Sequence, residues 1–415
     1  RFKQVFRERE ERSIAGEETL LSVSAYTGIT PRSEILEDGD HLSRAESLEG
    51  YKVCYPNDLV MNIMLAWNRG LGISPLHGIC SPAYSVFQVI DGSCPRFLHY
   101  MLRTDDYIRY FKAFSAGVID SRLRLYPDAF GALCTFLPSV NEQKQIADFL
   151  DHETAKIDAL VAEQEQLITL LKEKRQAVIS HAVTKGLDPS VPMKDSGVEW
   201  LGVVPAHWQV RKVKDVSRLE SGHTPSKTMP EYWVGCDIPW VSLNDSKYLA
   251  ANDYITDTAV QISQMGIENS SARLLPAGSV VFTRDATIGL AAITTREMAV
   301  SHHLIAWCPT DVMDPLYLLR VFNAMKDHLD SYTFGATIKT IGMGDVKSLM
   351  TPVPPSGEQL SIAAFITKEL TVLDKLVDEV AKSIDLLRER RSALISAAVT
   401  GQIDVRGLVA AQKAA

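Results

Sequence analysis

Two long stretches of the chain carry apolar residues at helical spacing. In residues 141–183 the apolar residues recur three, four or seven positions apart, at Ile146, Leu150, Ile157, Leu160, Leu167, Leu171 and Val178. In residues 357–399 the same spacing links Ile362, Ile366, Leu373, Val377, Val380, Ile384, Leu387 and Leu394. Such a narrow stripe is typical of a coiled-coil seam rather than of a broad amphipathic face. The pattern predicts two helices of roughly 40 residues, each about 60 Å long.

The two stretches are copies of one sequence. Shifting residues 354–404 back by 216 positions places them on residues 138–188 without a gap, and 23 of the 51 aligned residues are identical. A lone helix with an apolar stripe is marginal in water, so each stripe needs a partner, and the other copy is the obvious one. Each helix follows its own globular region at the same point. We therefore expect two long helices in an antiparallel coiled coil with pseudo-twofold symmetry.

Two similar globular regions precede the helices. In the first, short β-rich runs at residues 51–55, 59–61 and 84–90 lie between glycines and prolines, and a helix is expected over residues 96–114. This mixture predicts the α+β class. The expected order is a first globular domain at 1–137, a helix with its connector at 138–188, a second domain at 189–353, a second helix at 354–405 and a tail at 406–415. Residues 200–216 form the segment that leads from the connector into the second domain. In the first domain only the end of the equivalent segment is present, beginning at Arg1, so we expect its earlier part to be missing.

Composition narrows the class of protein. Hydrophobic residues make up 46% and charged residues 23%, as in folded soluble domains. No apolar run of about 18 residues predicts a membrane helix, and the charged first residues do not resemble a signal peptide, so we expect a cytoplasmic protein. The six cysteines are scattered without C-x-x-C spacing, which predicts buried thiols rather than a zinc site. The net charge is −8 and no region is net positive, so any DNA contact must be local.

Motifs that carry catalysis are missing from the sequence. There is no G-x-x-x-x-G-K-[ST] phosphate loop, no GxGxxG after a strand, and no Asn-Pro-Pro-aromatic run of the kind that holds an extruded base. Adjacent histidines on a strand, such as His302 and His303, would point to opposite faces and lack further ligands. We therefore expect no catalytic residue and no metal site in this chain.

The predicted architecture suits two kinds of function. Two heads on paired helices match a reader of two-part DNA sites, because heads on one face of a duplex must sit about 34 Å, or a multiple of that, apart. The same architecture also fits a non-DNA helical adaptor that presents two protein-binding heads, and the acidic net charge favours this alternative. An independent nuclease would need a carboxylate cluster that the sequence does not contain.

Short motifs in both globular regions resemble one family. The second region carries SGHTPSK at 221–227, YW at 232–233, IPWV at 238–241 and TRDATIG at 283–289. In this order they resemble the target-recognition domain of type I restriction-modification specificity subunits. The first region resembles another variant of that domain, through GITPRSE at 28–34, MNIMLAW at 61–67, GIS at 72–74 and SPAY at 81–84. Each region is followed by the family's helix, with its Glu-Gln start at 142–143 and 358–359.

The resemblance implies a subunit that selects a DNA sequence and catalyses no reaction itself. Each globular domain would read one half of a bipartite site in double-stranded DNA. The helix pair would fix the spacing and dock two methyltransferase subunits, which methylate adenine from S-adenosylmethionine. Motor and nuclease subunits, where present, would use ATP with Mg. No cofactor is expected in this chain.

Candidate DNA contacts lie in loops of the two regions. Arginine can bond bidentately to guanine, and lysine or threonine can bind phosphates or base edges. The candidates in the first region are Arg32, Asn62, Asn68, Arg69, Arg122 and Arg124. Those in the second are Thr224, Ser226, Lys227, Thr283, Arg284, Thr337, Lys339 and Thr340. Alternatives stay open: the charged loops can be merely solvated, residues 224–227 a plain turn, and Arg69 and Arg284 paired with nearby carboxylates.

Other side chains are assigned to structure. The residues expected to pack between the helices are Ile146, Leu150, Ile157, Leu160, Leu171, Ile362, Ile366, Leu373, Val377 and Leu387. Glu142, Gln143, Glu358 and Gln359 are expected to cap the helix starts or to meet the junction between domain and helix. Trp67, Trp233 and Trp240 are expected in the core or at its edge rather than as stacking platforms.

Overall fold

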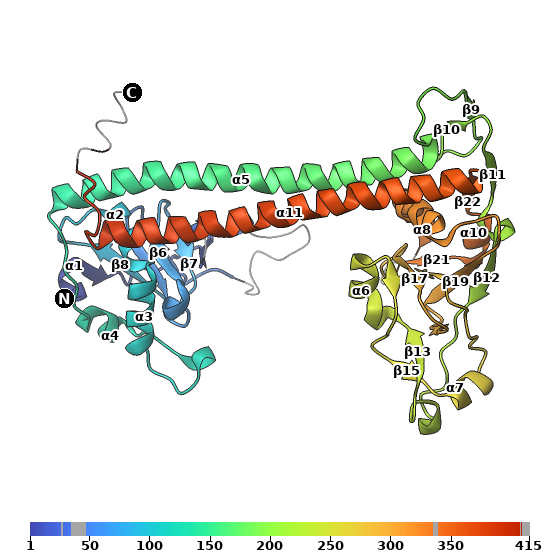
Figure 1. Ribbon diagram of the computed structural model, residues 1–415. Coiled ribbons are helices and arrows are strands. Elements are labelled where there is room, and N and C mark those ends of the chain that lie inside the picture. Colours follow the sequence, from blue (N-terminus) through green and yellow to red (C-terminus); the bar gives the residue numbers. More distant parts are fainter. Residues whose placement is uncertain (26–27, 35–46, 335–338, 407, 409–415) are drawn as a thin grey trace. The chain divides into compact units, whose positions relative to one another are not determined.

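The chain folds into two compact units that share two long helices. The computed structural model describes residues 1–25, 28–34, 47–334, 339–406 and 408 (Figure 1). Unit 1 comprises Arg1–Glu165 and Lys382–Ala415, and unit 2 comprises Gln166–Ala381. The helices α5 (Val140–Lys185) and α11 (Ser356–Val399) each run through both units. Each unit therefore contains one globular head and one part of each helix, whereas the sequence suggested heads and helices as separate segments.

The head of unit 1 is built from short strands and short helices. The strands are β1 (Phe6–Glu8), β2 (Leu21–Ser24), β3 (Gly28–Pro31), β4 (Lys52–Cys54), β5 (Leu59–Asn62), β6 (Leu71–Ile73), β7 (Gly78–Cys80) and β8 (Tyr84–Val89). The helices are α1 (Phe2–Val5), α2 (Pro95–Leu102), α3 (Asp105–Ala113) and α4 (Pro127–Ala132), with 3-10 turns η1 (Arg32–Glu34), η2 (Ala66–Asn68) and η3 (Asp120–Arg122). One antiparallel sheet has the order β1-β8-β5-β6, and β2–β3 and β4–β7 form separate pairs. The three predicted strands are thus confirmed as β4, β5 and β8.

The single helix predicted over residues 96–114 is wrong, because α2 and α3 are separated at Arg103 and Thr104. Thr104 has an extended backbone (φ −68°, ψ 156°) that ends the helical path. The guanidinium of Arg103 donates to the backbone carbonyls of Ala25 (2.8 Å), Arg69 (3.0 Å) and Leu71 (2.5 Å). Burial lowers the pKa of Arg103 to about 10. The break therefore points the Arg103 guanidinium into the head, where it bonds to these three carbonyls and to that of Ser24 (3.3 Å).

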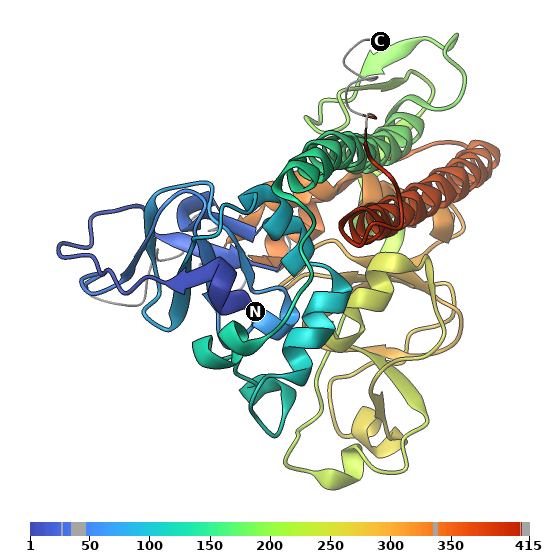
Figure 2. The same ribbon diagram turned by 90° about the vertical axis from the view of Figure 1, so that its left-hand side faces the viewer.

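Apolar side chains from the head and from both helices make the core of unit 1. An aromatic group forms its centre: the Phe2 and Phe130 rings stack at 4.8 Å, and Phe6, Phe87 and Phe111 surround Phe130. The start of α5 and the end of α11 close this core, and Figure 2 shows them side by side above the head. Burial raises the pKa of the Cys54 thiol to about 11 and that of Cys80 to about 12, so both remain protonated.

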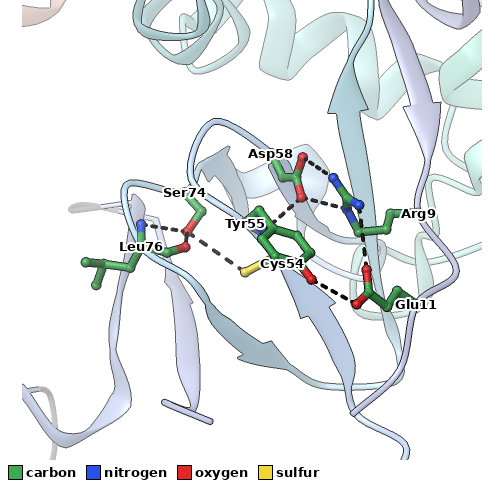
Figure 3. A network of polar contacts seen from close by, with 7 residues as sticks. All are labelled: Arg9, Glu11, Cys54, Tyr55, Asp58, Ser74 and Leu76. Atoms are coloured by element: carbon green, nitrogen blue, oxygen red, sulfur yellow. Dashed lines mark hydrogen bonds and ion pairs between the residues drawn. The ribbon is translucent and has the colours of Figure 1, made fainter.

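A polar network fixes the turn that leads into β5 (Figure 3). Asp58 accepts hydrogen bonds from Arg9 Nε (2.9 Å) and from the backbone N–H of Tyr55 (2.9 Å). The Tyr55 hydroxyl donates to Glu11 (2.9 Å), and the Arg9 guanidinium lies 4.6 Å from the centre of the Tyr55 ring. The Arg9 cation, the two carboxylates and the Tyr55 ring thus meet one another's charge and hydrogen-bonding needs in this half-buried site. The network therefore has a structural role.

The head of unit 2 repeats the plan of unit 1 with more strands. Its strands are β9 (Met193–Asp195), β10 (Val203–Pro205), β11 (Gln209–Lys212), β12 (Ser217–Ser221), β13 (Ile238–Val241), β14 (Tyr254–Ile255), β15 (Gln261–Ile262), β16 (Val280–Thr283), β17 (Ala291–Thr294), β18 (Ala299–Val300), β19 (Leu304–Pro309), β20 (Thr333–Phe334), β21 (Thr340–Ile341) and β22 (Met350–Val353). Its helices are α6 (Ser246–Ala251), α7 (Gln264–Glu268), α8 (Pro315–Ala324), α9 (Lys326–Ser331) and α10 (Met343–Ser348), with 3-10 turns η4 (Val213–Asp215), η5 (Pro230–Tyr232) and η6 (Leu243–Asp245).

Two sheets organise the head of unit 2. The larger has the order β12-β19-β16-β17-β14 and the smaller β15-β13-β18, while β9–β10, β11–β22 and β20–β21 pair separately. The largest core cluster joins the five-stranded sheet to α8 and to both long helices, with Trp208, Trp307 and Tyr317 fully buried. β12–β19–β16 in unit 2 matches β1–β8–β5 in unit 1, because Val280 pairs with Trp307 as Leu59 pairs with Phe87. The predicted repeat of the heads is therefore present in their strand pairing.

In both units the segments of α5 and α11 pack against each other in antiparallel order. Within unit 1, Arg391 pairs with Asp158 (2.8 Å) and Arg388 with Glu165 (3.0 Å); within unit 2, Arg175 lies 3.4 Å from Asp374. The predicted packing residues that are buried are Ile146, Leu150, Ile157, Ile362, Ile366 and Leu373. Leu171, Val377 and Leu387 are half-buried. The antiparallel pairing is confirmed for these positions.

Leu160 is a wrong prediction, since its side chain is 45% exposed. The half-buried positions around it are Val161 and Gln164, and the next apolar one is Ile168. The seam thus steps through 157, 161, 164 and 168, at spacings of four, three and four. The sequence prediction placed the seam at Leu160 and Leu167 because they are large apolar residues. Both lie on the neighbouring face of the helix, where Leu167 is 38% exposed.

One buried glutamine per unit joins head to helix. In unit 1 the Gln143 carbonyl accepts the backbone N–H of Cys94 (2.7 Å), and its amide donates to the Pro138 carbonyl (3.0 Å). In unit 2 Gln359 accepts from Asp314 N–H (2.8 Å) and donates to the Pro354 carbonyl (2.8 Å). Both side chains are 1% exposed. The predicted role of these glutamines at the junction is confirmed.

Candidate nucleic-acid interface

In unit 2 three chain segments meet at the end of β16. The backbone N–H of Arg284 donates to the His303 carbonyl (3.0 Å), and the Arg284 carbonyl accepts from Ile341 N–H (3.0 Å). Ala286 N–H donates to the Lys339 carbonyl (2.9 Å). Ala286 has φ +64°, a left-handed conformation that is uncommon without glycine and is often found at functional loops. We name the segments 222–228, 284–287, 301–303 and 339–341 the unit 2 loop cluster.

The polar side chains of the unit 2 loop cluster bond to one another. His303 Nδ1 lies 2.7 Å from Asp285 Oδ2, and Thr224 Oγ1 lies 2.5 Å from His302 Nδ1. The two imidazole rings lie 3.8 Å apart, in a turn rather than on a strand. The expectation that they point to opposite faces is therefore wrong. Burial and the neighbouring His303 lower the pKa of His302, which favours its neutral, hydrogen-bonding form.

Arg284 and Asp285 carry unused hydrogen-bonding capacity. Arg284 Nε lies 3.7 Å from Asp285 Oδ1, which is too long for a hydrogen bond. Both atoms are buried and have no hydrogen-bond partner among the described residues. Such groups are costly in a finished core and are common where a ligand supplies the missing partner. The expected pairing of Arg284 with a nearby carboxylate is thus only partial.

Glycine and tryptophan hold the first loop of the cluster in place. A Cβ on Gly222 would meet the Ser301 carbonyl oxygen at 1.9 Å, so only glycine fits where the two backbones cross. The indole N–H of Trp240 donates to the His223 carbonyl (3.1 Å), and that of Trp233 donates to the Ser226 carbonyl (3.0 Å). Both tryptophans are core-edge anchors, as predicted. They leave Ser226 and Lys227 exposed at the tip.

The same meeting of segments occurs in unit 1. Leu125 N–H donates to the Ile63 carbonyl (2.9 Å), as Ile341 N–H does to Arg284 in unit 2. Arg124 therefore occupies the place of Thr340. Arg124 also pairs with Ala116 through two backbone hydrogen bonds (2.8 and 2.9 Å), which close a loop that presents Arg122 to solvent. We name segments 62–69 and 116–125 the unit 1 loop cluster.

Two candidate side chains have local partners and little exposure. Asn62 is 4% exposed and its carbonyl accepts from Met64 N–H (3.0 Å). Thr283, its counterpart, is fully buried and its hydroxyl donates to the Thr287 carbonyl (2.5 Å). Each side chain shapes the loop that follows its strand. As direct DNA contacts these two residues stay predictions.

The remaining candidates are spread over both heads. Arg69, with φ +58°, bonds to the Arg103 carbonyl (3.2 Å) and pairs with Asp105, while Asn68 is exposed. Arg32 lies in η1, and its buried Nε has no hydrogen-bond partner among the described residues. Lys339 is exposed and Thr340 half-buried. Thr337 lies outside the described residues.

Three residues that the sequence did not nominate help to build the clusters. His303 and Asp285 form the ion-pair geometry described above, and Arg103 holds the backbone of the unit 1 loop at Arg69 and Leu71. The doublet His302-His303 was a visible signal, but its arrangement depends on a turn. No feature of the sequence singled out Arg103. Within the helix predicted over residues 96–114 it looks like an ordinary cation on the helix surface.

The two loop clusters have the character of a binding surface rather than of a metal site among the described residues. No three His, Cys, Asp or Glu side chains among them gather closely enough to hold a metal ion. Both clusters carry exposed or half-buried cations and hydroxyls on loops whose backbones are held in place by hydrogen bonds. Such an arrangement is suited to binding a polar, anionic partner.

Comparison with known proteins gives one consistent family. Residues 205–379 match the family model described as the type I restriction modification DNA specificity domain. The chain is 30% identical over 193 residues to the type I restriction enzyme MjaIX specificity subunit of Methanocaldococcus jannaschii, covering 46% of this chain and 43% of that protein. It is 25% identical over 275 residues to the HindI specificity subunit of Haemophilus influenzae, covering 65% and 58%. The chain thus matches about half the length of these relatives.

Solved structures agree on the fold along nearly the whole chain. A chain from a study of complex assembly and conformational transition in a type I R-M system has a TM-score of 0.69 at 16% identity, covering 95% of this chain and 97% of that one. The HsdS subunit from Thermoanaerobacter tengcongensis has a TM-score of 0.53 at 16% identity, covering 96% and 97%. At this identity the likeness concerns the fold alone.

Proposed function

We propose that this chain, a member of the type I restriction-modification specificity subunits, selects the DNA sequence on which a restriction-modification complex acts. The observation that carries the proposal is the paired loop clusters. In both heads the loop after the central strand is bonded to the segment that leads into the long helix, through Ile63–Leu125 and Arg284–Ile341. Each head would read one half of a bipartite site in double-stranded DNA.

The chemistry of the clusters supports DNA as the ligand. Arg122, Lys227 and Lys339 are exposed and form no ion pair with any described residue. At a net charge of −8 such local cations are where a phosphate backbone would be attracted, and the salt dependence of binding should be correspondingly modest. The helical-adaptor alternative has no comparable support, because it does not explain why the cations gather on loops that meet at the same place in both heads.

The two heads would read different bases. Arg124 and Thr340 occupy equivalent places but differ in chemistry, since a guanidinium can bond bidentately to guanine and a threonine offers one hydroxyl and a methyl group. We therefore place sequence reading at these two positions and phosphate contact at the exposed lysines. The bases themselves depend on how each side chain meets the groove.

Chemistry would come from partner subunits. We propose that two methyltransferase subunits, which transfer a methyl group from S-adenosylmethionine to adenine, dock on the outer faces of the helices, and that motor and nuclease subunits using ATP with Mg can join them. Large apolar side chains remain exposed on those faces: Leu160 and Leu386 in unit 1, and Leu167, Leu170, Leu360, Phe365, Val372 and Leu376 in unit 2. Exposed apolar surface at helical spacing is typical of a docking face.

The location follows from the same proposal. Within the described residues we find no helix long and apolar enough to span a membrane. A protein that selects sites on chromosomal DNA would act in the cytoplasm, and we propose that location. A fraction of the protein that sediments with membranes and resists washing at high salt would contradict it.

Sequencing of modified bases tests the function as a whole. In cells that carry the partner subunits, deletion of this gene should abolish methylation at one bipartite adenine motif. Replacing residues 198–353 with the matching domain of a relative should change only one half of that motif. If every adenine-methylation motif survives the deletion, the proposed function is wrong.

Single substitutions test the two reading positions. Arg124→Gln should relax base preference in one half of the site and Thr340→Val in the other, each by about 1–3 kcal/mol at one base pair. Arg109→Gln is the matched control for Arg124, because Arg109 already pairs with Asp106 (2.6 Å) on the surface of α3. Competition binding of the assembled complex to a library of variant sites measures the effect. Equal losses at both half-sites would assign these residues to backbone contact instead.

A further inference from the structure

The unit 1 loop cluster contains a narrow two-stranded loop between α3 and α4, which projects from the head beyond α3 (Figure 1). We name residues 116–124 the tip loop. Ala116 and Arg124 face each other across its base and exchange two backbone hydrogen bonds (2.8 and 2.9 Å). Gly117 follows with φ +151°, and a Cβ there would meet the Arg122 carbonyl oxygen at 2.7 Å, so only glycine fits this turn. The backbone of the tip loop thus holds it in one conformation.

Two adjacent apolar side chains stand uncovered at the end of the tip loop. The Val118 side chain is 98% exposed and that of Ile119 is 53% exposed. Both residues are β-branched and have few rotamers, so they lose little conformational freedom when a partner covers them. One exposed apolar residue is common on a protein surface, but here two occupy the end of a fixed loop in the candidate interface. This position is suited to an apolar contact with a ligand.

The charges around the tip loop favour an anionic ligand. Asp120 is the only carboxylate among residues 114–126, and it pairs with Lys112 of α3 (2.8 Å). Arg122 is exposed and forms no ion pair with any described residue, and Arg124 is half-buried across the loop. An apolar protein surface would gain nothing from these cations. Duplex DNA, in contrast, places phosphates beside the edges of its bases, so it can engage the cations and the apolar tip together.

The two-stranded form of the tip loop selects one groove of the duplex. The major groove is about 12 Å wide and admits a two-stranded ribbon, whereas the minor groove is only about 6 Å wide. The apolar group that base pairs display in the major groove is the C5-methyl group of thymine. Arginine can bond to guanine or to phosphate, but the Val118 side chain can bond to neither. The thymine methyl is therefore the group that matches an exposed valine in this groove.

We propose that the tip loop enters the major groove of the half-site read by unit 1, and that Val118 contacts the methyl group of a thymine there. Resting on the proposed function, this contact gives unit 1 a second reading residue: Arg124 reads a base through hydrogen bonds, and Val118 reads another through an apolar contact. Ile119 enlarges the apolar surface beside Val118. The contact removes apolar surface of both partners from water, which favours thymine over pyrimidines that lack the methyl group.

Uracil tests the contact, because it pairs with adenine as thymine does and lacks only the methyl group. The half-site of unit 1 is the one that stays unchanged when residues 198–353 are replaced. Duplexes that carry one uracil at a time in this half-site compete with the thymine duplex for the assembled complex. We expect uracil at one position to weaken binding about fourfold, which corresponds to the loss of one buried methyl group. Uracil at the other positions should change binding little.

Val118→Ala should abolish the response to uracil. The variant should bind the thymine duplex about fourfold more weakly or worse, and it should bind thymine and uracil duplexes equally at the sensitive position, because either change removes the same contact. Its thermal unfolding midpoint should not change, since the Val118 side chain is 98% exposed. Ile14→Ala is the matched control, because its side chain is 91% exposed and lies outside the unit 1 loop cluster. This control should keep the full response to uracil.

Three results would overturn the methyl contact: a half-site with no thymine on either strand, no response to uracil at any position, or a response that survives Val118→Ala. A loss of affinity in Val118→Ala without any response to uracil would assign Val118 to the DNA backbone or to insertion between base pairs. The proposed function is measured separately, by the preference of the unchanged complex for its own site over a scrambled duplex. With that preference intact, these results reject the methyl contact alone; without it, both the contact and the proposed function fail.

Discussion

At the scale of single residues, buried polar side chains decide how each head meets its helices. Gln143 and Gln359 each satisfy one backbone N–H, and they satisfy one and two backbone carbonyls, respectively, that would otherwise be buried without partners. Exposed charges at the helix starts contribute less, because water screens them. The sequence showed that a Glu-Gln pair recurs, and the structure shows that the glutamine is the member that is buried in both units.

Replacing either glutamine should destabilise the protein. Gln143→Ala and Gln359→Ala each leave a buried N–H unpaired, which costs about 1–3 kcal/mol. Urea unfolding followed by circular dichroism measures the loss. Gln166→Ala, at an exposed position on α5, is the matched control and should change stability by less than about 0.5 kcal/mol. Equal effects at Gln143 and Gln166 would contradict a role in the junction.

His99 makes the stability of unit 1 depend on pH. Its Nδ1 accepts a hydrogen bond from Ile73 N–H (3.2 Å), so that nitrogen must be unprotonated in the fold. Burial, with Arg103 and Arg391 nearby, lowers the pKa of His99 to about 3 from an ordinary value of 6.5. Because the unfolded chain binds a proton more readily than the native one, stability is complete above pH 6.5 and falls as the pH drops from 6.5 toward 3.

Removing that titration should flatten the pH profile. Between pH 7 and pH 5 the protein should lose about 1–2 kcal/mol of unfolding free energy through His99. His99→Asn, whose amide oxygen can still accept the Ile73 N–H, should lose less over the same range. Urea unfolding at the two pH values gives both numbers. Parallel profiles for the two proteins would show that His99 is not the group responsible.

At the scale of elements, the helix seam is set by burial rather than by residue size. The buried positions of α5 in unit 1 include Leu150, Thr154 and Ile157, so a threonine lies in the seam while Leu160 lies outside it. Thr154 fits there because its hydroxyl donates to the Leu150 carbonyl (2.6 Å). Apolar spacing alone cannot reveal such a position, since the satisfied hydroxyl is visible only in the folded helix.

Two substitutions on one helix separate seam from outer face. Leu150 is fully buried, so Leu150→Ala should cost about 2–5 kcal/mol of unfolding free energy. Leu160→Ala should cost much less, because its side chain already meets water. Chemical denaturation of the two variants measures the difference. A loss at Leu160 as large as that at Leu150 would restore it to the seam. Under the proposed function, Leu160→Ala should instead weaken binding of a methyltransferase subunit.

At the scale of the whole molecule, the units repeat their internal contacts while their loops differ in chemistry. The hydrogen bonds Phe2–Leu133 and Val213–Leu349, and Ile63–Leu125 and Arg284–Ile341, are the same pairs in two heads. Cations and hydroxyls change at the loop tips between them. Under the proposed function, this division fits a protein whose helices keep the same structure while the loops of its heads determine which DNA sequence is bound.

Lengthening the helices should change what the molecule recognises. Insertion of one heptad after Glu165 in α5 and of one after Ala381 in α11 keeps the apolar pattern and adds about 10 Å of helix. Under the proposed function the half-sites should stay the same, while the spacer between them grows by about three base pairs or methylation is lost. Sequencing of modified bases reads the result. An unchanged spacer with full methylation would refute the helices as the element that sets spacing.

The sequence by itself determined the two helices, the repeat, the α+β heads and the glutamine junctions. These follow from periodicity and from identity between copies, which are local in sequence.

Only the tertiary structure decided the break at Arg103, the close approach of the His302 and His303 rings and the exposure of Leu160. Each of these depends on contacts between segments that are far apart in the sequence. Such contacts set which side chains are buried and which backbone edges are covered, and no local pattern encodes them.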